Sequence, residues 1–210
     1  MPGEYSRAMA WYDFFSAFYD ASLEKHYREQ RVLATAALDL QPGSVVLDLP
    51  CGTGQSFPGL CAGVGPSGRV LGVDLSAGML RQAARRVERG GLTGVTLARA
   101  DATTLDLAAV GGARPDRLHI FLGMSVFPDP EATFGHLWSL LAPGGRCVIV
   151  DCHAEKLSFQ GRMVNLLAGA DIRRRSWAPL EAVGAQFERR DLPSLPLHGG
   201  QLFLATAVKP

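Results

Sequence analysis

One stretch near the start of the chain, residues 44–54 (SVVLDLPCGTG), constrains the fold more than any other. Its first half is a short β-branched and apolar run, which is typical of a fully buried strand. The strand ends at Asp48, and a tight turn with Gly52 and Gly54 leads toward a helix. Such a turn offers backbone N–H groups to a ligand, because no side chain covers them. The stretch therefore predicts an α/β fold with a ligand at this turn.

The residues around the turn disfavour a dinucleotide as that ligand. The third glycine of the G-x-G-x-x-G fingerprint would stand where the chain has Phe57. The carboxylate of Asp48 would repel a pyrophosphate but suits a ligand that carries positive charge. Glycine is common in any strand-to-helix turn, so an NAD-type oxidoreductase stays open as a disfavoured alternative.

Length and composition narrow the class of protein. A chain of 210 residues suits one domain, with room for a small cap. The net charge of +1 gives no electrostatic case for a nucleic-acid partner. We see no signal peptide and no apolar run of the roughly 20 residues that a membrane span needs. The cysteines show no C-x-x-C spacing, so we expect reduced thiols, no metal site and a soluble, cytoplasmic protein.

Strand-like and helix-like segments alternate along the rest of the chain. The strands are expected at residues 45–48, 69–74, 94–99, 115–122, 146–151, 187–191 and 201–208. Helices are expected at residues 57–62, 76–89, 131–141 and 177–186. This order predicts a doubly wound, mostly parallel seven-stranded sheet with its ligand at the carboxyl ends of the strands. Asp48, Asp74, Asp101 and Gly123 all fall at such ends.

Two of these acids have a functional and a structural interpretation. Asp74 follows the second strand, 22 residues after Gly52, where an acid can accept hydrogen bonds from a ribose diol. It could instead cap the helix at residues 76–89, although Ser76 is available for that role. Asp101 could accept a hydrogen bond from an exocyclic amine such as that of adenine, or it could form a loop turn. His119, in mid-strand, is interpreted as a packed core histidine and not as a base.

The motifs together resemble the class I S-adenosylmethionine-dependent methyltransferases over nearly the whole chain. Residues 47–54 (LDLPCGTG) are similar to the first motif of that family, usually D-x-G-C-G-T-G. Asp74 and residues 100–102 match its acids after the second and third strands, and residues 141–146 resemble its turn into the fifth strand. Pro50 departs from the usual glycine, which stiffens the loop and removes one backbone donor.

The resemblance implies a Rossmann-like methyltransferase fold and a set of roles at the cofactor S-adenosylmethionine. Asp48, with the turn Pro50, Cys51, Gly52 and Gly54, would hold the methionine portion. Asp74 would take the ribose hydroxyls, with Leu75 and Met79 against the adenine, whose edge Asp101 and Ala102 would contact. The Leu122 carbonyl and Gly123 would face the methionine ammonium.

Two segments outside the core bear on the methyl acceptor. Residues 1–40 are expected to form an N-terminal helical lid on a core of residues 41–210; its aromatic run at 11–20 could cover the ligand or only dock the leading helix. A helical insert is expected at about residues 152–176, with Phe159, Met163, Leu166 and Leu167 at helical spacing and three arginines from Arg173 onward. It is either a packed amphipathic helix with a solvated basic end or a helix that contacts an anionic membrane.

The make-up of these segments favours a small, largely hydrophobic acceptor, which is quinone-like, lipid-like or a secondary metabolite. Polar groups for it are few, and the catalytic candidates are Tyr12, Tyr19, Ser125 and His153. His198 would join them only if its loop folds inward. A non-catalytic adenosyl-binding module is the remaining alternative, and the oligomeric state is left open.

Overall fold

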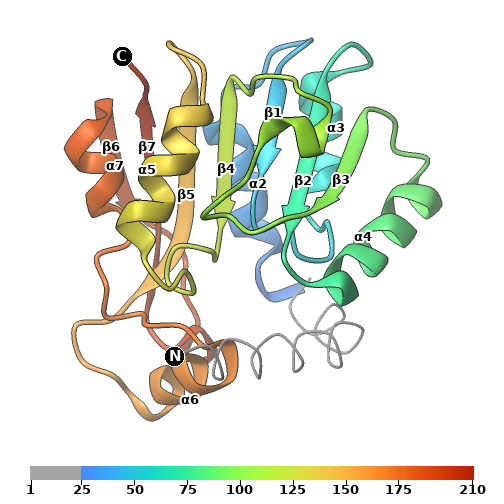
Figure 1. Cartoon of the computed structure of the whole chain (residues 1–210). Helices are drawn as coiled ribbons and strands as arrows, with labels where there is room; N and C mark the ends of the chain where they lie inside the picture. Colours follow the sequence, from blue (N-terminus) through green and yellow to red (C-terminus); the bar gives the residue numbers. More distant parts are fainter. Residues whose placement is uncertain (1–24) are drawn as a thin grey trace.

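A computed structural model describes residues 25–210 of the chain as a single sheet with helices on both faces (Figure 1). The sheet has seven strands, in the order β3-β2-β1-β4-β5-β7-β6. Their bounds are β1 Val45–Asp48, β2 Arg69–Asp74, β3 Val95–Arg99, β4 Arg117–Phe121, β5 Arg146–His153, β6 Ala185–Asp191 and β7 Gln201–Val208. The predicted doubly wound sheet is confirmed. The proposed lid lies largely outside the described residues.

The first five strands run parallel and place all their carboxyl ends at one edge of the sheet. β1 lies in the middle and pairs in parallel with β2 and β4, while β4 pairs with β5. The last strand in the chain, β7, enters antiparallel between β5 and β6. β1 and β4 are neighbours in space although two strands separate them in sequence. This change of winding direction is where ligands bind in doubly wound sheets.

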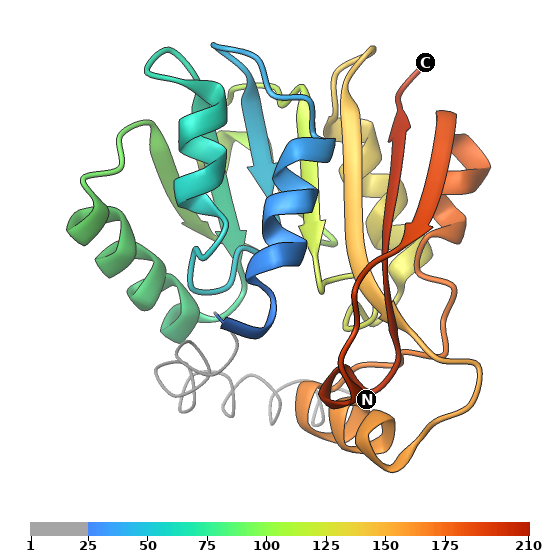
Figure 2. The same cartoon turned by 180° about the vertical axis from the view of Figure 1, so that it is seen from behind.

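The helices form two layers, one on each face of the sheet (Figures 1 and 2). On one face lie α2 (Arg28–Ala37), α3 (Phe57–Val64) and α4 (Ala77–Gly90); on the other lie α5 (Pro130–Leu140), α7 (Ala178–Val183) and the short η1 (Leu107–Val110). Successive residues of a strand point to opposite faces, so Val46 joins one core and Leu47 the other. Both side chains are fully buried.

Local sequence signals explain where the helices begin. The hydroxyl of Ser76 accepts a hydrogen bond from the Met79 amide and caps α4. Asp129 caps α5 in the same way, with Pro130 in the first turn. Ser158 caps α6 (Phe159–Ala168), which lies beyond the carboxyl end of β5 (Figure 1).

Two boundaries differ from those predicted. The leading helix was expected to start at residue 20 or 22, which lies outside the described residues; within them, α2 spans Arg28–Ala37. α7 ends at Val183, because Gly184 has extended backbone and β6 starts at Ala185 to pair with β7. β5 continues to His153 since β7 supplies a partner, Gln201, for that residue. The expected insert therefore consists of α6 with its two flanking loops, and no helix within residues 25–210 is long and apolar enough to cross a membrane.

Candidate active site

The glycine turn after β1 has the backbone that the sequence requires. Gly52 and Gly54 have φ values of 53° and 74°, a region that residues with a side chain rarely adopt. A Cβ at Gly54 would also lie 2.6 Å from the ring of Phe57. Phe57 itself is fully buried beneath the turn and fills the space that the third glycine of a dinucleotide fingerprint keeps open. The turn is thus built for a different ligand from a dinucleotide.

Asp74 holds this turn to the end of β2. One carboxylate oxygen accepts a hydrogen bond from the Gly52 amide at 2.9 Å, and the other accepts one from the Ser76 amide at 2.8 Å. Burial raises the pKa of Asp74, the two amides oppose that shift, and the charge of Asp48 adds to it. Because the hydroxyl of Ser76 caps α4, the carboxylate of Asp74 is not the helix cap. Asp74 remains 9% exposed at the strand end.

Asp48 forms a buried pair with His119, which the sequence did not reveal. Its Oδ1 lies 2.7 Å from Nδ1 of His119 on the neighbouring strand β4. His119 is fully buried, as predicted for a core histidine. Among residues 25–210, Oδ2 of Asp48 and Nε2 of His119 are buried without a hydrogen-bond partner. A buried carboxylate oxygen without a partner is costly, so this oxygen fits a ligand that brings a positive charge or a donor.

The turns after β1 and β4 touch each other through Pro50 and Gly123. A Cβ at Gly123 would overlap Cδ of Pro50 and lie 3.0 Å from Cγ2 of Ile120. Leu122, next to Gly123, has a left-handed φ of 55°, and its amide donates to Val150 of β5. The Leu49–Pro50 bond is cis. The proline that departs from the family motif therefore contacts the glycine expected near the methionine ammonium.

The remaining predicted cofactor residues line the same edge of the sheet. Cys51 is buried, and burial first, then Asp74 and Asp48, raise the pKa of its thiol. Leu75 is half-buried, and Met79 is buried in the first turn of α4. Asp101 follows β3, and one of its oxygens accepts hydrogen bonds from the amide and hydroxyl of Thr103. Asp101 thus forms the loop turn that was its structural interpretation, with Ala102 beside it.

Of the catalytic candidates, Ser125 has a buried carboxyl partner. Its hydroxyl and its amide donate to the two oxygens of Asp151, each at 2.8 Å, and Cys152 donates its amide to the same group. Burial raises the pKa of Asp151 to about 6. The sequence marked Asp151 only as a strand end. The signal that could have revealed this pair is a carboxyl group near the end of β5, the strand next to the one that leads into the Ser125 loop.

The two histidines named as candidates, His153 and His198, pack against other aromatic side chains. Nδ1 of His153 is 3.2 Å from the carbonyl oxygen of Arg174, and its ring packs edge-on against Trp177. His198 does not reach a pocket mouth: it is buried in η2 (Pro196–His198) and stacks on Tyr27 at 4.7 Å. Burial lowers the pKa of His198, and so does the charge of His26. Tyr12 and Tyr19 lie outside the described residues.

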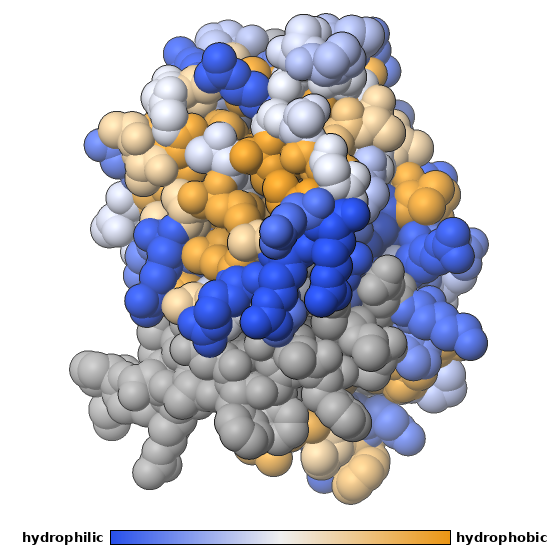
Figure 3. All heavy atoms as spheres, turned by 90° about the vertical axis from the view of Figure 1, so that its right-hand side faces the viewer, coloured by the Kyte–Doolittle hydropathy of each residue, from blue (hydrophilic) through white to orange (hydrophobic). Residues whose placement is uncertain are grey.

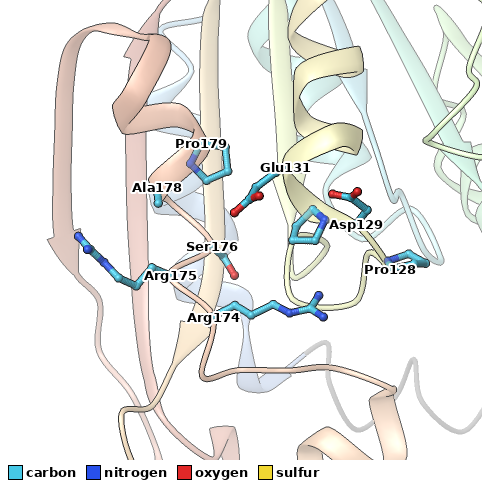
Figure 4. Close-up of a pocket in the computed structure, with 9 residues that line it drawn as sticks. Pro128, Asp129, Glu131, Arg174, Arg175, Ser176, Ala178 and Pro179 are labelled. Atoms are coloured by element: carbon cyan, nitrogen blue, oxygen red, sulfur yellow. The ribbon is translucent and has the colours of Figure 1, made fainter.

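A separate cavity of about 540 Å³ lies between the start of α5 and the segment that leads into α7 (Figure 4). Asp129 and Glu131 line one side, and Arg174, Arg175 and Ser176 the other (Figure 4). Arg174 also donates to the Phe127 carbonyl at 2.9 Å, which ties this wall to the loop after β4. None of the predicted site residues within 25–210 lines this cavity.

Comparison with known proteins gives a consistent assignment. A methyltransferase domain family matches residues 40–182, more than half of the chain. A protein of a Streptomyces fradiae transposon is 35% identical over 63% of this chain and 37% of its own length. A demethylmenaquinone methyltransferase of Thermobifida fusca is 33% identical over 71% of this chain and 58% of its own. The chain thus spans between about a third and three fifths of these relatives.

The fold has solved counterparts as well. A geranyl diphosphate methyltransferase structure, in complex with GPP and sinefungin, superposes with a TM-score of 0.71 at 20% identity, over 87% of this chain and 77% of the other. Together with the doubly wound sheet and the acidic strand ends around the glycine turn, the family match confirms the resemblance seen in the sequence. The chain belongs to the methyltransferase domain family.

Proposed function

We propose that the protein binds S-adenosylmethionine at the glycine turn and transfers its methyl group to a small, largely hydrophobic acceptor. The observation that carries this proposal is Asp74, a carboxylate anchored by the Gly52 and Ser76 amides at the strand end next to the turn. Its position suits a ribose diol, because an ionised carboxylate has about four acceptor sites and can accept further hydrogen bonds beside those from the protein amides. The family match supports the same function.

The unpaired oxygen of Asp48 is the second support. It is buried beside the turn, and His119 fixes the orientation of the carboxylate through the other oxygen. A methionine ammonium, directly or through water, would supply the missing donor. On this proposal Leu122 and Gly123 lie against the same group, while Asp101 and the Ala102 amide face the adenine edge, with Leu75 and Met79 beside the ring.

The protein's contribution to the chemistry is alignment. When bound, S-adenosylmethionine supplies a methyl group already activated on a sulfonium. The chain then needs to orient the acceptor and exclude water, since a positioned pair of reactants gains most of its rate from proximity. Ser125, held by Asp151, and His153 are the described polar candidates that could orient an acceptor. A dedicated base is unnecessary for an amine or a stabilised carbanion.

The acceptor class is proposed on two grounds. The relative from Thermobifida fusca carries the name of a demethylmenaquinone methyltransferase, so a quinone-like acceptor is a reasonable first choice. The insert around α6 also offers much apolar surface and few polar groups. A panel of quinone, lipid and secondary-metabolite acceptors with labelled methyl donor tests this directly. Turnover on RNA or peptides, with none on hydrophobic molecules, would overturn the acceptor class.

Calorimetry tests the cofactor. We expect binding of S-adenosylmethionine and S-adenosylhomocysteine but not of NAD. Asp74→Ala should weaken that binding by about 1.5–3 kcal/mol, roughly 10- to 150-fold, the scale for losing hydrogen bonds to a charged group. Asp191→Ala, at an exposed carboxylate of β6, is the matched control and should bind like the parent. Equal affinity of the Asp74 variant and the parent would remove the ribose assignment.

Binding without turnover on any acceptor in the panel would favour the non-catalytic adenosyl-binding module. Binding of NAD in place of S-adenosylmethionine would favour the oxidoreductase. The buried ring of Phe57 at the third glycine position disfavours that outcome.

A further inference from the structure

The most exposed apolar surface in the described part of the chain is concentrated on α6 and η2. Eight large hydrophobic side chains are exposed among the described residues. Five belong to these two segments and a sixth, Leu195, directly precedes η2; the five are Phe159, Met163, Leu166, Leu167 and Leu197. Phe159 is 74% exposed and Leu166 is 76% exposed. Single exposed hydrophobics are ordinary, but a group of this kind marks an interaction surface.

The exposed residues of α6 form a continuous stripe that faces away from the protein. They follow the spacing i, i+4, i+7 and i+8, which places them on one side of a helix. The opposite side carries Gly161 and Val164, which pack on the body: a Cβ at Gly161 would lie 2.8 Å from the Gly199 carbonyl oxygen. The usual polarity of a surface helix is therefore reversed on α6, since Gly161 is buried and Val164 half-buried on the inner side, whereas the large apolar residues of the stripe are exposed.

The charges near the stripe are mainly positive. Residues 152–176 contain five basic and two acidic side chains. Arg162 is the only charged residue of α6, and Lys156 lies in the loop just before it; both are exposed and form no ion pair with another described residue. Asp171 is already engaged by Arg173 and Arg174. An apolar helix face flanked by free cations is complementary to an anionic lipid surface.

The stripe also lies at the relevant end of the molecule. α6 lies beyond the carboxyl end of β5, the edge at which the candidate active site is found (Figure 1). In the view of Figure 3, hydrophobic atoms lie at the same lower end of the molecule. A second copy is a poorer occupant than a lipid surface. A symmetric pair of α6 helices would bring together two copies of Arg162 with no acidic residue on either helix.

We infer that the α6 stripe, with Leu195 and Leu197, docks the protein on an anionic lipid surface next to the entrance for the acceptor. This inference rests on the proposed function, which identifies the molecule that enters there as a hydrophobic methyl acceptor. Docking itself is independent of cofactor binding, so the two proposals fail separately.

Vesicle co-sedimentation of the full chain tests it. We expect binding to vesicles of equal parts phosphatidylglycerol and phosphatidylcholine, weaker binding to phosphatidylcholine alone, and release by salt. The double variant Phe159→Glu, Leu166→Glu should lose at least about tenfold in partitioning. Arg162→Glu should lose about fivefold or more. Val32→Glu, at a valine of α2 that is 64% exposed, is the control and should bind like the parent.

The affinity of each variant for S-adenosylmethionine is measured alongside and should equal that of the parent. Absence of binding to anionic vesicles would overturn the inference, as would equal loss in the Val32 control. A concentration-dependent dimer in the parent that the double variant abolishes would assign the stripe to a second copy instead. A parent protein that binds the anionic vesicles but not S-adenosylmethionine would count against the proposed function alone.

Discussion

Asp151 is a fully buried carboxyl group, and its protonation makes the stability of the fold depend on pH. Its oxygens accept hydrogen bonds from Ser125 and Cys152, yet burial still raises its pKa to about 6, above the value of about 3.9 for an unfolded chain. Between these two values the folded protein binds more protons than the unfolded one. Stability contributed by this group is therefore complete below about pH 4 and is lost as the pH rises toward 6.

Asp151→Asn should remove this dependence. We expect the free energy of unfolding of the parent to fall by about 3 kcal/mol from this group between pH 4 and 6, and the variant to show a flatter profile. The variant should also be less stable at pH 4, by about 1–3 kcal/mol, because an amide nitrogen cannot accept from the Ser125 amide. Urea unfolding at a series of pH values measures both effects. Parallel profiles for parent and variant would contradict the assignment of the pKa.

Single acids were predictable from the sequence, but their partners were not. Asp48 and Asp74 were placed correctly because the ends of parallel strands share one edge of a sheet. The pairing of Asp48 with His119 depends on β4 lying next to β1, and 71 residues separate the two. The pairing of Ser125 with Asp151 likewise depends on the neighbouring ends of β4 and β5. Strand order decides such contacts, and local patterns do not report it.

Among the elements, the two turns that meet through Pro50 and Gly123 are the most tightly constrained. A side chain at Gly123 has no room, because Pro50 and Ile120 already occupy its space. The sequence pointed to both positions, but as separate features of a family motif. Their contact joins the turn after β1 to the turn after β4, so each fixes the backbone of the other.

Gly123→Ala should therefore destabilise the protein by about 1–3 kcal/mol and weaken binding of S-adenosylmethionine, since the ring of Pro50 must shift. Gly135→Ala is the matched control. Gly135 lies on the exposed side of α5, and a Cβ there would meet nothing within 4 Å. The control should stabilise the protein by about 0.5–1 kcal/mol through helix propensity. Chemical unfolding and calorimetry of the two variants test this, and equal behaviour would show that Pro50 has room to move.

The start of a helix was predictable where a cap was recognised at the boundary, as at Ser76. The end of α7 was not, because residues up to 186 suit a helix and only pairing with β7 draws Ala185 into a strand. The direction of the stripe on α6 was left open as well. Periodicity indicates an amphipathic helix, but it does not say which side the body of the protein covers.

At the scale of the whole molecule, every strand found within residues 25–210 lies between residues 45 and 208. The described residues of both cores likewise lie at or after Tyr27. Removing residues 1–24 should leave a protein that unfolds cooperatively, with the circular dichroism of the parent. If the aromatic segment is a lid, the same truncation should weaken binding of S-adenosylmethionine and of the acceptor. Failure of the truncated chain to fold would support the alternative, that this segment docks the leading helix.

The place of β7 in the sheet has a consequence for how the protein is made. It follows every other strand in the chain, yet it lies between β5 and β6 and pairs with both. A ribosome delivers β5 and β6 before the strand that joins them, so both expose unpaired edges while synthesis continues. The parallel strands β1 to β5 can assemble in that interval, whereas β6 has no place in the sheet until β7 arrives. Unpaired edges are the part of a nascent sheet most prone to misassembly, so a pause in translation just before residue 201 would prolong the most vulnerable stage of folding.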